Sequence, residues 1–314
     1  MAAFVVRRLL ISVVVLFFVT LIGFSITHVL PGDPVTSILG ETASPQARVR
    51  VRQELNLNDP VPVQYGKWVW GALHLDFGKT FREGRPVGTE IRTRLAPTLE
   101  LGLLSIGFSF TLGILLGVVA AVNRNGPLDH LARFVGVIGV ATPNFWLGLL
   151  LIVLLAVKLR LLPAFGYVPF DQSPAENLKR MIMPVFAISL AQLAVIVRIS
   201  RGTMIEVLGE DFVRTARAKG LPGLMVMRRH VLKNGMIPVL TVAGLQVARV
   251  AGGAAVVETV FAIPGIGRLT AEAVQGHEYN VVQAVMLLSG VVIVAANMLV
   301  DMSYGWLDPR IRFS

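Results

Sequence analysis

Residues 9–30 read LLISVVVLFFVTLIGFSITHVL, a stretch in which no side chain carries a formal charge. A bilayer core about 30 Å thick needs roughly 20 apolar residues of helix, so this run is long enough to cross it. Arg7 and Arg8 precede the run, and no small-residue cleavage site follows it. The run therefore predicts a retained transmembrane helix and not a signal peptide.

The composition of the whole chain agrees with this first run. Of 314 residues, 54% are hydrophobic and only 15% are charged, and the mean hydropathy is +0.69. Soluble domains carry about 25% charged residues, which keep their surfaces hydrated. The composition therefore excludes a soluble domain and a disordered chain, and it predicts an all-α membrane protein. The absence of cysteine excludes disulfide bonds, thiolate metal sites and cysteine nucleophiles.

Five further apolar runs are long enough to cross a membrane. Pro143 predicts a kink in one of them, and the pair Gly113 and Gly117 fits the G-x-x-x-G pattern of closely packed helices. Together the runs predict six transmembrane helices: Leu9–Leu30, Thr98–Val122, Phe134–Val157, Met181–Val197, Met236–Phe261 and Val281–Tyr304.

The distribution of basic residues orients these helices. The short loops on one side of the membrane hold fourteen Lys and Arg residues, whereas the short loops on the other side hold five. Because short cytoplasmic loops are enriched in Lys and Arg, both termini are predicted to be cytoplasmic. The same distribution explains the net charge of +10. It excludes nucleic-acid binding, since no basic patch is interleaved with aromatic side chains that would stack on bases.

Two regions follow from this topology. Residues 1–97 are predicted to form the first transmembrane helix and a long extracytoplasmic segment. Residues 98–314 are predicted to form a five-helix core with a cytoplasmic loop at 198–235. In the outer segment, Pro31-Gly32-Asp33-Pro34 ends the first helix. Ser44-Pro45 then predicts the N-cap and the first residue of a short helix.

The sequence contains no recognisable catalytic or nucleotide site. Gly78-Lys79-Thr80 ends like a phosphate-binding loop, but the first glycine of that motif would stand at position 73, which is Leu73. Neither an H-E-x-x-H helix nor a G-x-S-x-G turn occurs, and no cluster of Asp, Glu and His marks a metal site. The chain is therefore predicted to be no enzyme and to bind no metal or cofactor. Any ATP and magnesium would be bound by a partner subunit.

The loop between the fourth and fifth predicted spans reads EDFVRTARAKG over residues 210–220. Acidic residues begin it, basic residues stand near its end and Gly220 closes it, a pattern typical of a short capped helix. Phe212, Ala216 and Gly220 recur at a spacing of four and predict one face of the helix. Such a helix would fit into the groove of a partner protein. The alternative is a basic amphipathic helix that lies on anionic membrane lipid.

This loop resembles the EAA loop of ABC importer permeases, in which a glycine is followed about eighteen residues later by a proline, as with Gly220 and Pro238. More narrowly, residues 210–221 are similar to the form E-D-[YF]-[VI]-R-T-A-R-A-K-G-L of dipeptide and oligopeptide permeases. The long outer segment looks like that of the B-type subunit. The resemblance extends over the chain: 30–34 (LPGDP), 62–65 (PVQY), 76–78 (DFG), 145–148 (FWLG), 256–261 (VVETVF), 264–268 (PGIGR) and 308–312 (DPRIR).

The resemblance implies a type I ABC importer permease fold in the bacterial cytoplasmic (inner) membrane. It also implies a heterodimer with a homologous second permease, two cytoplasmic ATPase subunits or a fused ATPase, and an extracytoplasmic substrate-binding protein. Closure of the ATPases would drive alternating access of a path for di- or oligopeptides. The implied ATPase contacts are Glu210, Asp211, Phe212, Arg214, Thr215, Ala216, Arg217, Lys219 and Gly220.

Other functions are compatible with parts of this pattern. Permeases of the same subfamily also import glutathione, nickel chelates and other small solutes, so these are alternative substrates. A stand-alone secondary transporter would show inverted repeats, and the long outer segment has no counterpart later in the chain.

Two charged residues fall inside the fifth predicted span, where an unpaired charge is costly. Arg249 is predicted either to meet a peptide carboxylate in the translocation pathway or to form an ion pair with the companion permease. Gln246, three residues earlier, shares its helix face and is predicted to line the pathway with it. Glu258 stands close to the outer end of the span, and a role in a gate or an interface is predicted for it.

Overall fold

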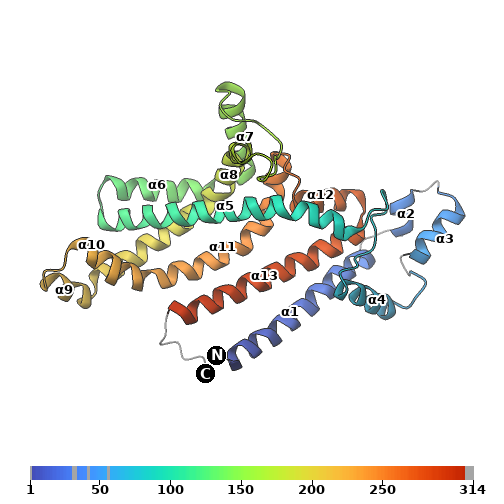
Figure 1. Ribbon diagram of the computed structural model, residues 1–314, viewed down its shortest axis with the longest axis horizontal. Coiled ribbons are helices and arrows are strands. Elements are labelled where there is room, and N and C mark those ends of the chain that lie inside the picture. The colour runs from blue at the N-terminus through green and yellow to red at the C-terminus, as the bar shows by residue number, and fades with distance from the viewer. Residues whose placement is uncertain (1, 30–33, 41–42, 55–56, 308–314) are drawn as a thin grey trace. The chain divides into compact units, whose positions relative to one another are not determined.

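The computed structural model describes residues 2–29, 34–40, 43–54 and 57–307, apart from the side chains of 2–5, 27–29, 34, 37, 38, 54, 243–253 and 300–307. These residues form helices and turns, and within them the one β-type contact is an isolated bridge between Lys79 and Pro86. Figure 1 shows the helices, which in chain order are α1 Ala2–Val29, α2 Pro34–Leu39, α3 Pro45–Glu54, α4 Val61–Leu73, α5 Val87–Val122, α6 Pro127–Ala141, α7 Asn144–Leu151, the π-helix η1 Ile152–Lys158, α8 Pro174–Gly209, α9 Asp211–Ala218, α10 Gly223–Val226, the π-helix η2 Met227–Val231, α11 Leu232–Val260, α12 Ile266–Gly276 and α13 Tyr279–Leu307.

Four helices among the described residues are long and apolar enough to cross a membrane: Val6–Ile26 of α1, Val87–Val122, Pro174–Gly209, and Tyr279–Leu299 of α13. They coincide with the first, second, fourth and sixth predicted spans. However, α5 and α8 contain 36 residues each and extend well beyond the apolar runs that predicted them. Hydropathy marks the part of a helix that suits hydrocarbon, not the residue at which the hydrogen-bonded helix ends.

The third predicted span is broken. Residues 134–157 are predicted as one helix, but α6 ends at Ala141, α7 begins at Asn144, and the two helical parts are bent by 105°. Pro143 has no N–H to donate and holds the preceding Thr142 in an extended conformation. The predicted kink is confirmed, and it is sharp enough to divide the predicted span into two helical parts. Figure 1 shows α7 projecting from the bundle that contains α5, α6 and α8.

The fifth predicted span lies in α11, which begins at Leu232. Asn234, Gly235 and Pro238 all lie inside this helix and do not interrupt it. The described residues thus contain four candidate spans, or five if the bent pair of α6 and α7 with η1 counts as one. The arrangement of six transmembrane helices remains a prediction.

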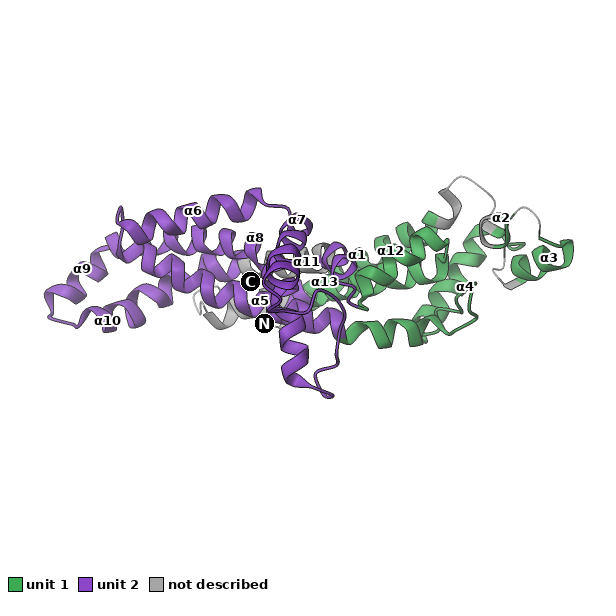
Figure 2. Ribbon diagram, turned by 90° about the horizontal axis from the view of Figure 1, so that it is seen from above, with its two compact units in different colours: residues 1–96, 264–295, 314 green, residues 97–263, 296–313 purple. Residues whose placement is uncertain are grey.

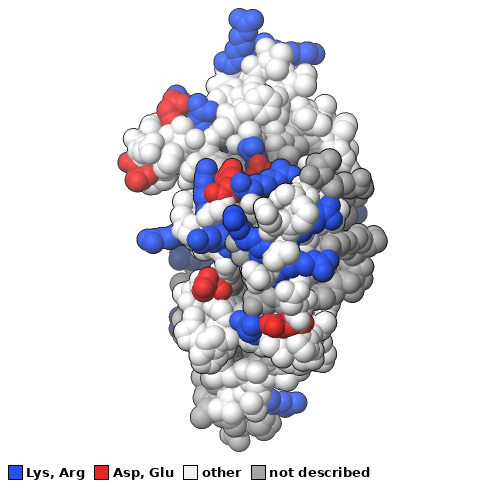
Figure 3. Space-filling model, turned by 90° about the vertical axis from the view of Figure 1, so that its right-hand side faces the viewer, with Lys and Arg blue, Asp and Glu red and all other residues white. Residues whose placement is uncertain are grey.

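The chain divides into two compact units, drawn in green and purple in Figure 2. The first contains residues 1–96 and 264–295, and the second contains residues 97–263 and 296–313. On the face seen in Figure 3, basic side chains are interspersed with acidic ones. The first unit has its own apolar core, made by the beginning of α5 together with α12 and α13: Val87, Ile91, Ile266, Leu269, Ala273, Val281, Val282, Ala284 and Val285.

A buried carboxylate holds the turn that contains Phe81 and Arg82 within the first unit. Glu278, between α12 and α13, accepts hydrogen bonds from the backbone N–H groups of Phe81 (2.6 Å) and Arg82 (2.9 Å). The side-chain amide of Asn280 donates to the carbonyl of Lys79 (3.0 Å). Only 8% of Glu278 is exposed. The turn that resembles a phosphate-binding loop is therefore held by a distant part of the chain and has a structural role.

Glycine residues bring three helices of the second unit into close contact. A Cβ atom on Gly117 of α5 would lie 2.5 Å from Cβ of Ser200 in α8, and one on Gly113 would lie 2.7 Å from Cγ2 of Ile196. A Cβ atom on Gly139 of α6 would likewise lie 2.7 Å from a side chain of α8. The close packing predicted for Gly113 and Gly117 is confirmed, and α8 is the helix against which both α5 and α6 pack.

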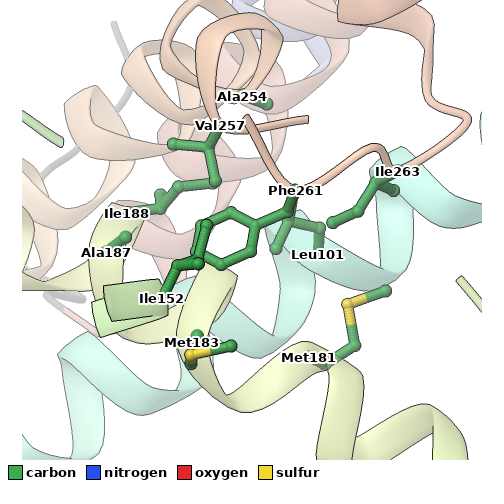
Figure 4. Close-up of a cluster of buried hydrophobic side chains, with 10 residues drawn as sticks. All are labelled: Leu101, Ile152, Met181, Met183, Ala187, Ile188, Ala254, Val257, Phe261 and Ile263. Carbon is green, nitrogen blue, oxygen red and sulfur yellow. The ribbon is translucent and has the colours of Figure 1, made fainter. Parts of the chain in front are cut away.

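An apolar cluster around Phe261 packs residues of α5, η1, α8 and α11 together in the second unit (Figure 4). The carbonyl of Phe261 accepts a hydrogen bond from the N–H of Gly166 (2.9 Å), which ties the segment after η1 to the end of α11. In that segment Tyr167 donates to Glu100 (2.7 Å), and burial together with this bond raises the pKa of Tyr167. The buried members of the cluster are Leu101, Ile152, Met181, Met183, Ala187, Ile188, Ala254, Val257, Phe261 and Ile263.

A pair of alanine substitutions in α5 tests the glycine packing. Gly117→Ala is expected to destabilise the protein by about 1–3 kcal/mol, because the added Cβ overpacks against Ser200. At Gly107 no atom lies within 4 Å of an added Cβ, so Gly107→Ala is expected to be neutral or to stabilise by roughly 0.5–1 kcal/mol. Thermal unfolding of the two detergent-solubilised variants measures the difference. Equal stability would contradict the close approach of α5 and α8.

Candidate functional site

The segment that the sequence singles out forms the helix α9, Asp211–Ala218, as predicted. Two backbone hydrogen bonds close its C-terminus, from the N–H of Gly220 to the carbonyl of Arg217 (2.9 Å) and from the N–H of Leu221 to the carbonyl of Ala216 (3.3 Å). These two bonds form a Schellman motif, whose left-handed position is occupied by Gly220 with φ of +75°. α9 is consequently a well-terminated helix.

One face of α9 is anchored in the protein. Val213 is fully buried and Ala216 nearly so. Two residues of the face predicted to fit a partner's groove are open, since 42% of Phe212 is exposed and no atom lies within 4 Å of a Cβ built on Gly220. Ala216, the third, is buried together with Val213, because residues three apart share a helix face. The binding of a partner to that face stays a prediction. Val213 and Ala216 pack with residues of α5, α8, α10 and η2, namely Ala121, Met204, Val226 and Val231.

The opposite face of α9 is exposed. Arg214 donates to Asp211 at 3.3 Å, and Thr215 donates to the backbone carbonyl of Asp211 at 2.9 Å. Exposed ion pairs such as Arg214–Asp211 contribute little to stability, so these side chains are available to a partner. We call the following exposed residues the α9 surface: Glu210, Asp211, Phe212, Arg214, Thr215, Arg217, Lys219 and Gly220.

The predicted loop 198–235 is largely helical. α8 continues through Arg198 to Gly209, and η2 joins α10 directly to α11. Non-helical residues are confined to position 210 and to 219–222. Figure 1 shows α9 and α10 together at one end of the bundle of the second unit. α9 is therefore joined to α8 through the single non-helical residue 210 and to α10 through residues 219–222.

Glu258 lies inside the second unit and connects two helices. It is fully buried, and its Oε1 accepts a hydrogen bond from the hydroxyl of Thr98 in α5 at 2.7 Å. Three residues later, directly after the end of α11, stands Phe261, the centre of the cluster in Figure 4. The predicted role of Glu258 in a gate or interface remains a prediction. The side chains of Gln246 and Arg249 lie outside the described residues, and their predicted place in the pathway is also untested.

The structure contains a buried ion-pair network that sequence reasoning did not find. Asp129, in the first turn of α6, is fully buried, and Arg201 of α8 donates to it through both Nε and Nη2, the latter at 2.9 Å. Arg133 donates at 2.7 Å and the N–H of Asn125 at 2.9 Å. An acid in the first turn of a helix is ordinarily read as stabilising the helix dipole. The sequence offers no signal that links Asp129 to a residue 72 positions away.

Comparison with known families places these features in context. Residues 113–313 match the family model described as binding-protein-dependent transport system inner membrane component. Residues 1–102 match the model described as the N-terminal part of a binding-protein-dependent transport system membrane component. The two matched segments together cover almost the whole chain.

Similar curated proteins are permeases by name. A putative peptide transport system permease of Brucella abortus (strain 2308) is 39% identical over 313 residues and covers 100% of both chains. A dipeptide transport system permease of Escherichia coli (strain K12) is 39% identical over 336 residues and covers 99% of both. Among solved structures, a chain of the MetNI methionine ABC transporter in inward-facing conformations is 18% identical, with a TM-score of 0.55 over 69% of this chain and 96% of that one. The last comparison shows a shared fold.

Two substitutions on adjacent residues of α9 test which side of the helix is anchored. Val213→Ala is expected to destabilise the packing of α9 by about 1–2 kcal/mol, since it removes fully buried methyl groups. Phe212→Ala removes a larger side chain, but an exposed one, and is expected to change stability by less than about 0.5 kcal/mol. Hydrogen exchange over residues 211–218, read by mass spectrometry, reports both effects. Faster exchange in the Phe212 variant than in the Val213 variant would contradict the burial.

Proposed function

Because this chain belongs to the family of binding-protein-dependent transport system inner membrane components, we propose that it forms half of the translocation pathway of an ATP-driven peptide importer. Relatives named as peptide and dipeptide permeases match the chain over its full length and support di- or oligopeptides as substrates. A permease of this family is non-catalytic, and partner ATPases hydrolyse the ATP. Residues 98–314 form its five-helix core in this proposal.

The observation that carries the proposal is the two-sided structure of α9. Val213 and Ala216 fix the helix to α5 and α8, while the α9 surface projects away from the protein with Phe212 among charged side chains. A partly exposed aromatic side chain beside arginines is typical of the residues that dominate protein interfaces. In the proposed importer the α9 surface binds a groove of the ATPase.

Coupling then follows from the way α9 is attached. Closure of two ATPases on ATP displaces α9, and α9 moves the helices on which it packs. Shifting a two-state equilibrium from about 1:99 to 99:1 needs roughly 5.5 kcal/mol of differential binding. ATP binding to the partner subunits supplies this free energy in the proposal, and the permease converts it into alternating access.

The remaining partners follow from the same proposal. A homologous second permease completes the pathway across the bacterial inner membrane, with six transmembrane helices contributed by this chain and both termini in the cytoplasm. An extracytoplasmic binding protein delivers the peptide to the outer face. The two ATPases are separate subunits or one fused chain.

Purification of the protein from its native membrane tests the assembly. Two ATPase subunits and a second permease are expected to copurify with it, and ATP hydrolysis is expected to rise when binding protein and peptide are added. Transport by this polypeptide alone in liposomes would contradict the proposal.

Gly220→Asp tests the role of the α9 surface. The variant is expected to fold, because Asp tolerates the left-handed conformation better than most residues, and to lose copurification of the ATPases, because a side chain and a charge enter their binding surface. Lys179→Gln, which removes an exposed cation from the beginning of α8, is the control and is expected to retain them. Gly220→Asn separates the effect of charge from that of bulk. Normal assembly and transport in Gly220→Asp would count against the docking role.

A further inference from the structure

The network around Asp129 lies one helical turn from the anchor of α9. Arg201, its principal partner, precedes Met204 by three residues in α8, and Met204 packs with the buried Val213 of α9. Ser200, the residue immediately before Arg201, lies against Gly117 of α5. Residues three apart occupy the same face of a helix. The part of α8 that contains Arg201 therefore contacts both α9 and α5.

Asp129 itself joins three elements of the second unit. Its carboxylate accepts a hydrogen bond from the backbone N–H of Asn125, in the turn between α5 and α6. In this turn Asn125 has φ of +63°, and the N–H of Gly126 donates to the carbonyl of Asn123 (2.8 Å). It also accepts hydrogen bonds from the side chains of Arg133, in its own helix, and of Arg201, in α8. One side chain thus fixes the turn, the beginning of α6 and the adjoining part of α8.

The contact is also directional. A guanidinium that binds a carboxylate through two nitrogens fixes distance and orientation together, which a single charge contact does not. Asp129 is fully buried, so water does not compete for its oxygens. Removing one partner of such a pair leaves an uncompensated buried charge. The network is therefore a stiff connection between α6 and α8, and α6 leads through the break at Pro143 to α7.

We propose that Asp129 and Arg201 are positioning residues for coupling: they hold α6 to α8, so that a displacement of α9 carries α6 and α7 along with α8. The proposal rests on the proposed function, because it concerns how a movement that begins at the α9 surface is distributed. Without the connection, α8 still follows α9, but α6 follows it incompletely. ATP is then hydrolysed with less movement of the pathway.

The test uses the complete importer, reconstituted in liposomes with its second permease, ATPases and binding protein, and alanylalanine as the probe. Arg201→Lys keeps the positive charge but not the two-pronged contact. It is expected to assemble and to lower the amount of dipeptide imported per ATP hydrolysed by about fivefold. An unchanged ratio in Arg201→Lys would overturn the proposal.

A double variant separates positioning from structural support. Asp129→Asn with Arg201→Gln removes both charges of the buried pair. Arg133 loses its carboxylate partner, but 47% of its side chain is exposed to solvent. No fully buried charge is left uncompensated, so thermal stability and assembly are expected to return close to those of the unmodified protein. The transport ratio is expected to stay low, because neutral side chains hold the helices less firmly. Recovery of the ratio together with stability would show structural support only and overturn the proposal, as would failure of all these variants to assemble.

A distance measurement gives a readout that does not depend on the peptide. The chain has no cysteine, so Leu131→Cys in α6 and Arg198→Cys in α8, both exposed positions, carry spin labels at two sites only. The distance between the labels is expected to be the same without nucleotide and with ATP trapped, and to change with nucleotide once Arg201→Lys is added. If the distance changes with nucleotide in the labelled protein that still has Arg201, the proposal is overturned.

The control and the reference complex separate this proposal from the proposed function. Lys179→Gln removes a cation from α8 at an exposed ion pair with Glu176 and is expected to leave the transport ratio unchanged. A loss in this control equal to that in Arg201→Lys would overturn the specific role of the network. Failure of the unmodified complex to bind ATPases would overturn the proposed function and this proposal together, whereas intact coupling in all variants would overturn this proposal alone.

Discussion

A polar group that is kept from water must find its hydrogen-bond partner inside the protein, and most of this fold follows from that requirement. The long helices α1, α5, α8 and α13 satisfy their backbone groups within themselves. Three buried carboxylates satisfy theirs across the chain: Asp129 with Arg201, Glu258 with Thr98, and Glu278 with the backbone at Phe81 and Arg82. These three carboxylates thus connect segments that are distant in sequence.

Apolar and glycine surfaces provide the contact area around those connections. Gly113 and Gly117 allow α5 to approach α8, and Gly139 allows α6 to approach the same helix. Such packing is close but not directional, since dispersion forces act over any well-fitted surface. The carboxylates add the direction. Together they make α8 the element on which α5, α6 and α9 all depend within the second unit.

The division of α9 into an anchored and an exposed face gives the proposed function its physical basis. A helix that is held by Val213 and Ala216 transmits a force, and a helix that exposes Phe212 and Arg214 offers a partner something to bind. Neither face alone would couple an external ATPase to a membrane pathway. The proposal agrees with the membership of this chain in a family of non-catalytic permeases.

The sequence by itself determined the features that depend on near neighbours or on composition. These include the apolar runs of the candidate spans, the termini of α9 from its acids and Gly220, the break at Pro143 and the family, which rests on motifs spread along the chain. It did not determine which face of α9 is buried, because spacings of three and four both fit a helix. It also did not determine that α5 and α8 extend beyond their apolar runs. The pairs Asp129–Arg201, Thr98–Glu258 and Phe81–Glu278, separated by 72, 160 and 197 positions, were decided only by the tertiary structure. A hydrogen bond needs its two atoms within about 3 Å, and only the packing of whole helices brings residues so far apart in sequence to that distance.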